Sequence, residues 1–66
     1  MSVAKTITLS AESDGGVEDA IRQGIAKANE TLRNIEGAWV KDIKVDVKDG
    51  QIVGYRVYLE VTFVLD

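Results

Sequence analysis

Trp39 is the side chain in this sequence that most directly suggests a binding function. It is the only tryptophan in a chain of 66 residues that contains no histidine and no cysteine. We expect it where a predicted helix gives way to a predicted strand, within residues 34–41. A large aromatic side chain at such a boundary favours either stacking against a planar ligand or filling a contact between subunits. The residues by themselves leave both interpretations open.

Charged side chains on the predicted strands suggest two further kinds of chemistry. Asp42 and Asp46 are expected on one strand face with Glu60 near them, and carboxylate oxygens suit Ca²⁺ or Mg²⁺. Lys44 stands between the two aspartates on that face, which favours a self-neutralised, solvated strand over an ion site. Arg56 has five donors and no acceptor, so it suits an anionic ligand group, although an ion pair with Asp42 is the simpler interpretation because it needs no ligand.

Several functional classes are disfavoured by composition. Without histidine or cysteine there is no imidazole or thiolate for catalysis or zinc binding, and we expect no enzyme. The formal net charge of −3 disfavours nucleic acid as a partner. No apolar run approaches the roughly 20 residues of a membrane span, and the first residues lack the apolar core of a signal peptide. We therefore expect a cytoplasmic protein without a membrane partner.

The length predicts one domain, residues 1–66, that associates with copies of itself. A chain this short buries only about 60% of its unfolded surface and is marginal as a monomer. Disulfides are excluded because the chain has no cysteine, which leaves oligomerisation as the usual supplement.

The alternation and spacing of apolar residues predict the first two elements. Residues 3–10 alternate as a strand, and residues 11–16 form a turn by composition. Gly16 is the expected N-cap of a helix, and Asp19 is placed to reach back to the free amide groups. Gly37 is expected to end this helix as a left-handed cap. Its apolar stripe has a small middle and comprises Val17, Ala20, Ile21, Gly24, Ile25, Ala28, Leu32 and Ile35.

Two strands follow, over residues 39–48 and 52–65. In the first, Trp39, Ile43, Val45 and Val47 are expected on one face, interrupted by Lys41. A three-residue turn ending at Gly50 keeps odd residues opposite odd residues. This register places Ile43 opposite Tyr55 and Asp42 opposite Arg56. The predicted fold is α+β, with the order β-α-β-β and a three-stranded antiparallel sheet wrapped around one helix.

This order of elements, together with the spacing of several segments, resembles the dodecin family over essentially the whole chain. None of the segments is diagnostic alone. They are Glu18-Asp19-Ala20, residues 28–35 (ANETLRNI), Ala38-Trp39-Val40 and residues 55–63 (YRVYLEVTF).

The resemblance implies a hollow homododecamer that stores or sequesters flavin, either riboflavin or FMN, at positions shared between subunits. The flavin-stacking tryptophan of the family falls on Trp39. The candidate flavin contacts are therefore Trp39, its neighbours Ala38 and Lys41, and Arg56.

Arg56 departs from the family pattern. Flavin-binding dodecins typically have glutamine here, and its amide both donates to and accepts from the edge of the isoalloxazine ring. Arginine only donates. The alternative is therefore a flavin-free assembly of the same architecture, which binds a cation such as calcium or serves a structural role.

Overall fold

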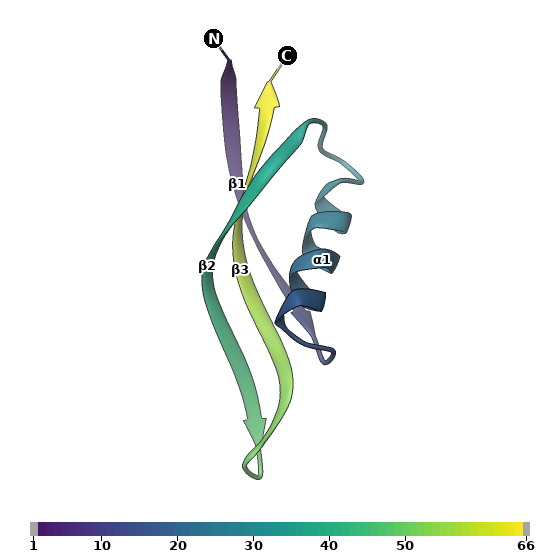
Figure 1. Cartoon of the computed structure of the whole chain (residues 1–66), viewed down its shortest axis with the longest axis vertical. Helices are drawn as coiled ribbons and strands as arrows, with labels where there is room; N and C mark the ends of the chain where they lie inside the picture. Colours follow the sequence, from purple (N-terminus) through teal and green to yellow (C-terminus); the bar gives the residue numbers. More distant parts are fainter. Residues whose placement is uncertain (1, 66) are drawn as a thin grey trace.

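One helix packs on one face of a three-stranded antiparallel sheet (Figure 1). A computed structural model of the chain describes residues 2–65. The elements are β1 (Val3–Ser13), α1 (Val17–Ala28), β2 (Ile35–Lys48) and β3 (Gln51–Leu65). The strand order is β1-β3-β2, so β3 is central. The predicted β-α-β-β fold is confirmed.

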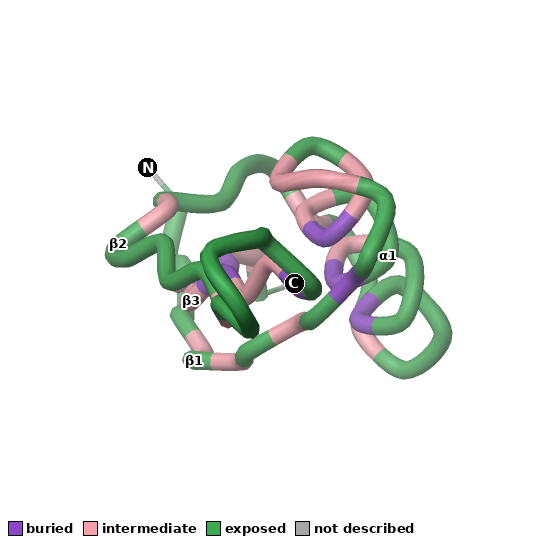
Figure 2. The backbone as a smooth tube through the Cα atoms, turned by 90° about the horizontal axis from the view of Figure 1, so that it is seen from below, coloured by how far each residue is buried: buried purple, intermediate pink, exposed green. Residues whose placement is uncertain are grey.

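The core lies between α1 and the central strand. Val57, Leu59 and Val61 of β3 are fully buried, together with Ala20 of α1. These three odd-numbered positions of β3 define the inner face of the sheet, which packs on α1, and the opposite face is the outer face. In Figure 2 the buried positions are few and, apart from Ser13 at the end of β1, lie on α1 and β3, as expected for so small a chain.

The helix approaches the sheet closely at Gly24. A Cβ atom added there would lie 3.1 Å from Leu59 Cδ1 and 3.2 Å from both Ala11 Cβ and Leu9 Cδ1. A side chain at this point would therefore require the neighbouring residues to shift by a few tenths of an ångström. The small middle of the helical stripe predicted this approach.

The helix ends earlier than predicted. α1 stops at Ala28, and Asn29 is its C-cap, with its N–H donating to Ile25 O at 2.9 Å. The predicted cap Gly37 lies inside β2 instead. The apolar spacing continued to Ile35, but Ile35 pairs with Phe63 of β3, so sheet pairing replaces further helical turns.

Two details at the start of the helix differ from the prediction. β1 runs to Ser13, through residues expected to form the turn. Gly16 is the N-cap as predicted, but no side chain caps it. Asp19 accepts hydrogen bonds from the Ser13 hydroxyl and from Gln23 Nε2 (2.6 Å) rather than from the free amide groups. The carboxylate of Asp19 thus ties the end of β1 to the first turn of α1.

The β2–β3 turn is shorter than predicted. Lys48 pairs with Gln51, leaving a two-residue loop of Asp49 and Gly50. Both have positive φ, 53° and 76°, as in the type I′ turn that suits the twist of a hairpin. The predicted three-residue loop is therefore wrong. A register shift between Asp46 and Val47 restores odd-with-odd pairing further along the strands.

A second register shift determines which face Trp39 occupies. Val40 pairs with Leu59, whereas Asp42 pairs with Tyr58, so Lys41 is the extra residue of a β-bulge. Val40 thereby contributes to the core on the inner face. Trp39 pairs with Glu60 and lies on the outer face. The prediction that Trp39 shares a face with Ile43 is wrong, because the bulge reverses the alternation between them.

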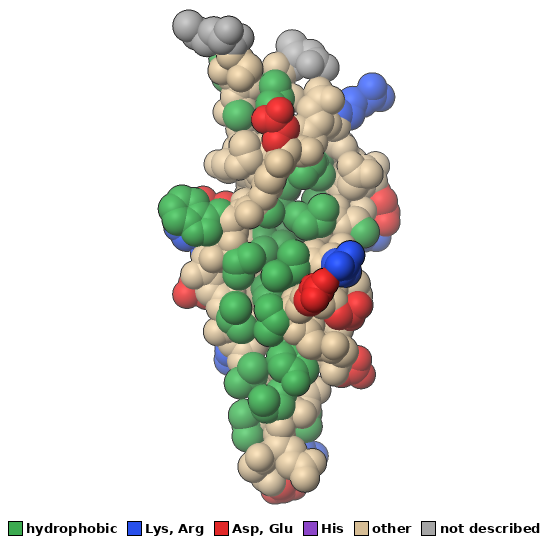
Figure 3. Space-filling model, viewed as in Figure 1, with side chains coloured by type: hydrophobic (Ala, Val, Ile, Leu, Met, Phe, Trp, Pro, Cys, Tyr) green, Lys and Arg blue, Asp and Glu red, His purple; other side chains and the backbone are tan. Residues whose placement is uncertain are grey.

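The β2–β3 hairpin extends beyond the helix and leaves apolar side chains exposed. The molecule measures 51 × 19 × 13 Å, and Figure 3 shows hydrophobic side chains along its middle and down to the hairpin end. We call the exposed apolar residues of this hairpin the hairpin patch: Ile43, Val45, Val47, Ile52 and Val53. Their exposed fractions range from 39% to 60%, because the single helix does not cover this part of the hairpin.

Candidate functional site

The indole of Trp39 is the most exposed large apolar side chain of the described residues. It is 67% exposed and lies on the outer face, opposite Glu60 in the antiparallel register. Trp39 lies well inside β2 rather than at a helix–strand boundary, so the predicted boundary position is wrong. The residues on either side, Ala38 and Val40, are both paired with β3, so the ring projects from a strand and not from a loop.

Lys41 and Glu60 gather at this indole. The Lys41 ammonium nitrogen lies 4.3 Å from the centroid of the Trp39 ring, the distance of a cation–π contact. The same nitrogen lies 3.8 Å from Glu60 Oε1. We call these three residues the indole cluster. It combines a flat apolar surface with one positive and one negative group at its edge.

Ala38 is separated from the indole cluster by the pleat of the sheet. It pairs with Val61, so its side chain belongs to the inner face while that of Trp39 belongs to the outer face. Of the four predicted contacts, Trp39 and Lys41 are therefore brought together. Ala38 adjoins them only through its main chain.

Arg56 is also on the outer face, but it is bound to a different partner. Its Nη2 donates to Glu12 Oε1 of β1 at 2.8 Å. The predicted partner Asp42 lies opposite Tyr58, and Arg56 lies opposite Lys44 on β2, so the predicted pair is wrong. The negative charge of Glu12 is the main cause that raises the pKa of Arg56 above its ordinary value, followed by their hydrogen bond. Arg56 is accordingly charged at any ordinary pH.

Arg56 and the indole cluster occupy separate stretches of the outer face. Arg56 precedes Glu60 by four residues along β3, roughly 13 Å at the usual rise of a strand. The Arg56 side chain is 37% exposed, yet its Nε atom is buried and has no hydrogen-bond partner among the described residues.

The sequence did not reveal the two carboxylates that pair with the basic site residues, Glu60 with Lys41 and Glu12 with Arg56. Glu60 was assigned to the neighbourhood of Asp42 and Asp46, and Glu12 was assigned to a turn. A period-two pattern extended from residues 3–10 to residue 12 would have placed Glu12 on a strand, where it pairs with Arg56. The bulge that brings Lys41 to Glu60 left no comparable signal in the sequence.

Of the two aspartates on β2 that were considered for an ion site, Asp46 pairs with Lys44, as a self-neutralised strand predicts. Lys44 Nζ lies 3.9 Å from Asp46 Oδ1. Within residues 2–65, no group of three or more carboxylates is placed to hold a metal ion. In the same part of the chain, no helix is long and apolar enough to cross a membrane.

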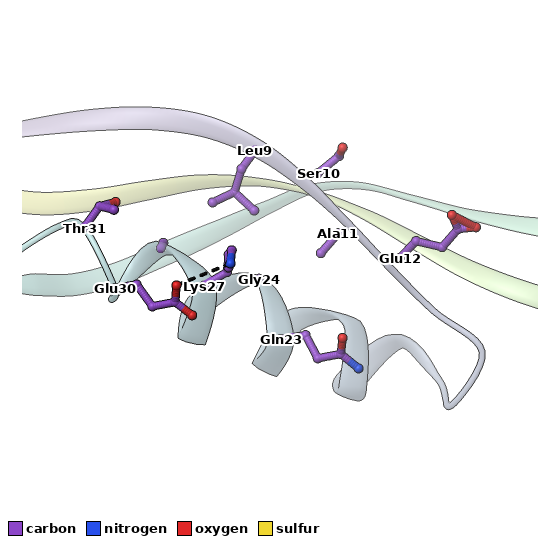
Figure 4. Close-up of a pocket in the computed structure, with 10 residues that line it drawn as sticks. Leu9, Ser10, Ala11, Glu12, Gln23, Gly24, Lys27, Glu30 and Thr31 are labelled. Carbon is purple, nitrogen blue, oxygen red and sulfur yellow. Dashed lines mark ion pairs between the residues drawn. The ribbon is translucent and has the colours of Figure 1, made fainter.

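A groove of about 630 Å³ lies elsewhere, between β1 and α1 (Figure 4). It contains none of the predicted site residues. Leu9, Ala11 and Gly24 form part of its lining, and the Lys27–Glu30 ion pair (3.3 Å) lies beside it. The small residues that let α1 approach the sheet also leave this space beside them.

Comparison with known proteins identifies the class. The family model for dodecins matches residues 3–66. A dodecin of Thermus thermophilus is 36% identical over 64 residues, which cover 97% of this chain and 93% of that protein. This chain therefore belongs to the dodecin family.

Solved dodecin structures agree with this fold over nearly the full length. A single-residue mutant of the Thermus thermophilus dodecin superposes with a TM-score of 0.93 at 35% identity, covering 100% of this chain and 98% of that one. A dodecin from Streptomyces davaonensis gives 0.91 at 34% identity, covering 98% and 96%. One from Streptomyces coelicolor gives 0.91 at 26% identity, covering 98% and 93%.

Proposed function

We propose that this dodecin stores or sequesters flavin, riboflavin or FMN, by stacking the isoalloxazine ring on Trp39. The observation that carries the proposal is the 67% exposed indole on β2, where Trp39 is paired with Glu60 of β3. Apolar area exposed to water is unfavourable at roughly 25 cal/mol per Å². A planar aromatic ligand covers such a surface and adds stacking energy of about 1 kcal/mol.

The proposal includes assembly with further copies of the chain, twelve by the family resemblance. The hairpin patch supports association because its residues stay exposed in the single chain. On the outer face, Tyr58 and Val64 of β3 are half-buried, which provides a second apolar surface. Burial of both surfaces would supply the stability that a 66-residue core lacks.

A storage role without catalysis, in the cytoplasm, completes the proposal. The chain has no histidine or cysteine, and its basic groups on the outer face are held by carboxylates. The alternative, a flavin-free assembly that binds calcium, has less support. Lys44 already neutralises Asp46, one of the carboxylates it would require.

The test is a titration of the flavin-free protein with riboflavin and FMN, followed by flavin and tryptophan fluorescence. We expect mutual quenching that saturates near stoichiometric flavin, because electron transfer from a stacked indole quenches the excited flavin. Trp39→Ala should abolish flavin quenching, and Trp39→Phe should retain part of the affinity. Sedimentation velocity of both variants checks that each one assembles to the same mass as the wild type. Absence of quenching with wild-type protein up to high micromolar flavin would refute the proposal.

A further inference from the structure

We propose that Lys41 is a displaceable cap on the Trp39 indole, and thus a residue that sets how strongly planar ligands bind there. The ligand part of this inference rests on the proposed function. The cap itself rests on geometry alone: the ammonium nitrogen lies 4.3 Å from the ring centroid and 3.8 Å from Glu60 Oε1.

The ammonium group is held from two directions. Trp39 and Lys41 lie on the same strand, and Glu60 lies opposite Trp39 on β3. The Lys41 and Glu60 side chains are 40% and 37% exposed, so neither extends fully into solvent. The cation–π contact and the ion pair therefore favour the same position of the ammonium, above one face of the ring.

The β-bulge explains why the lysine is available for this position. With Lys41 as the extra residue, Val40 takes the inner-face position opposite Leu59. Lys41 is therefore not part of the core, and its ammonium group lies beside the indole. The bulge thus serves packing on one face and positions the cap on the other.

A planar ligand that stacks on the capped ring face must replace the ammonium. The ligand gains a stacked contact, but the cation–π contact is lost, and Lys41 remains paired with Glu60 beside the ligand. Removing the lysine should therefore strengthen ligand binding. From the usual strength of exposed cation–π contacts we expect a gain of about two- to five-fold in affinity.

The outer face also provides a matched control. Lys44 is a second lysine of β2 on this face, paired with Asp46 at 3.9 Å, and no contact joins it to the indole cluster in the described part of the chain. Lys44→Ala removes one positive charge from the same strand without uncovering the ring. Any general effect of net charge on ligand affinity will appear in this variant too.

The first measurement needs no flavin. Trp39 is the only tryptophan, so quenching of its fluorescence by acrylamide reports access to this one ring. Lys41→Ala should raise the quenching constant by up to about two-fold, because one of the two ring faces is uncovered. Lys44→Ala should leave it unchanged, and Lys41→Gln should reproduce the increase if the alanine variant folds poorly. An unchanged constant in the Lys41 variants would overturn the cap.

The second measurement repeats the riboflavin titration with the same proteins. The proposal expects tighter binding by Lys41→Ala and wild-type affinity for Lys44→Ala. Equal or weaker binding by the Lys41 variant would overturn the ligand part, since the lysine would then be neutral or a supporting contact. If no protein binds riboflavin while acrylamide quenching rises, the proposed flavin function fails and the cap stands.

Discussion

Arg56 and Trp39 illustrate how two side chains on separate stretches of one sheet face acquire different roles. Both project from the outer face, but Arg56 donates to Glu12 on β1 while Trp39 presents an exposed ring. The ion pair joins Arg56 to β1, and its buried Nε has no hydrogen-bond partner among the described residues. The residue that departs from the family pattern is therefore tied to the sheet.

Replacing Arg56 by the family's usual glutamine should increase the affinity for riboflavin. An amide both donates and accepts, which suits the neutral ring edge, whereas the guanidinium only donates. Riboflavin titrations of Arg56→Gln and wild type measure the difference. Glu12→Gln is the control: it breaks the same ion pair but keeps the guanidinium, and should not reproduce the gain. Riboflavin binding by Arg56→Gln that is no tighter than wild type would contradict this account.

At the scale of elements, the close approach of α1 to the sheet is the most constrained feature. The nearest neighbours of Gly24 include Ala11 Cβ, which has no rotamer by which to move away. The same contact fixes the height of the helix above β1 and borders the groove between them. Packing there depends on the absence of a side chain.

Gly24→Ala should therefore destabilise the protein. Forcing a methyl group into this contact costs about 1–3 kcal/mol, which exceeds the roughly 1 kcal/mol gained in helix propensity. Denaturant unfolding should show a lower midpoint. Gly37→Ala is the matched control, since its added Cβ meets nothing within 4 Å and its φ is not in the left-handed region. Equal denaturant midpoints for the two variants would show that the neighbours of Gly24 move to accommodate the added methyl group.

For the whole molecule, the determining feature is the long hairpin on a small core. β2 and β3 carry the hairpin patch beyond the reach of α1 (Figures 1 and 3). An exposed apolar surface of this kind is typical of an interaction site. Within the proposed assembly, other copies of the chain cover the hairpin patch.

A charge in the hairpin patch should dissociate the assembly without unfolding the chain. Ile43 is 56% exposed in the single chain, so Ile43→Asp costs the isolated chain little, but it would bury an unpaired carboxylate between subunits. Sedimentation velocity should show a species much smaller than wild type. Lys48→Asp, an exposed change on the same strand, should keep the wild-type mass. A wild-type mass for Ile43→Asp would exclude the patch from the interface.

The sequence by itself determined the elements and their order. Alternating apolar residues specified the strands, and three- and four-residue spacing specified the helix, because these periods are local properties of the backbone. The residues that pack the core followed from the same patterns, as did the close approach at Gly24. Trp39 was identified by its type.

The tertiary structure decided the face on which Trp39 lies and the partners of the charged residues. A bulge at Lys41 reversed the alternation, and the two-residue turn with its own bulge changed the hairpin register. The central position of β3 brought Glu12 to Arg56 from a strand 44 residues away in sequence. Such pairings depend on the combined packing of distant segments, and a shift of one residue exchanges the two faces of a strand.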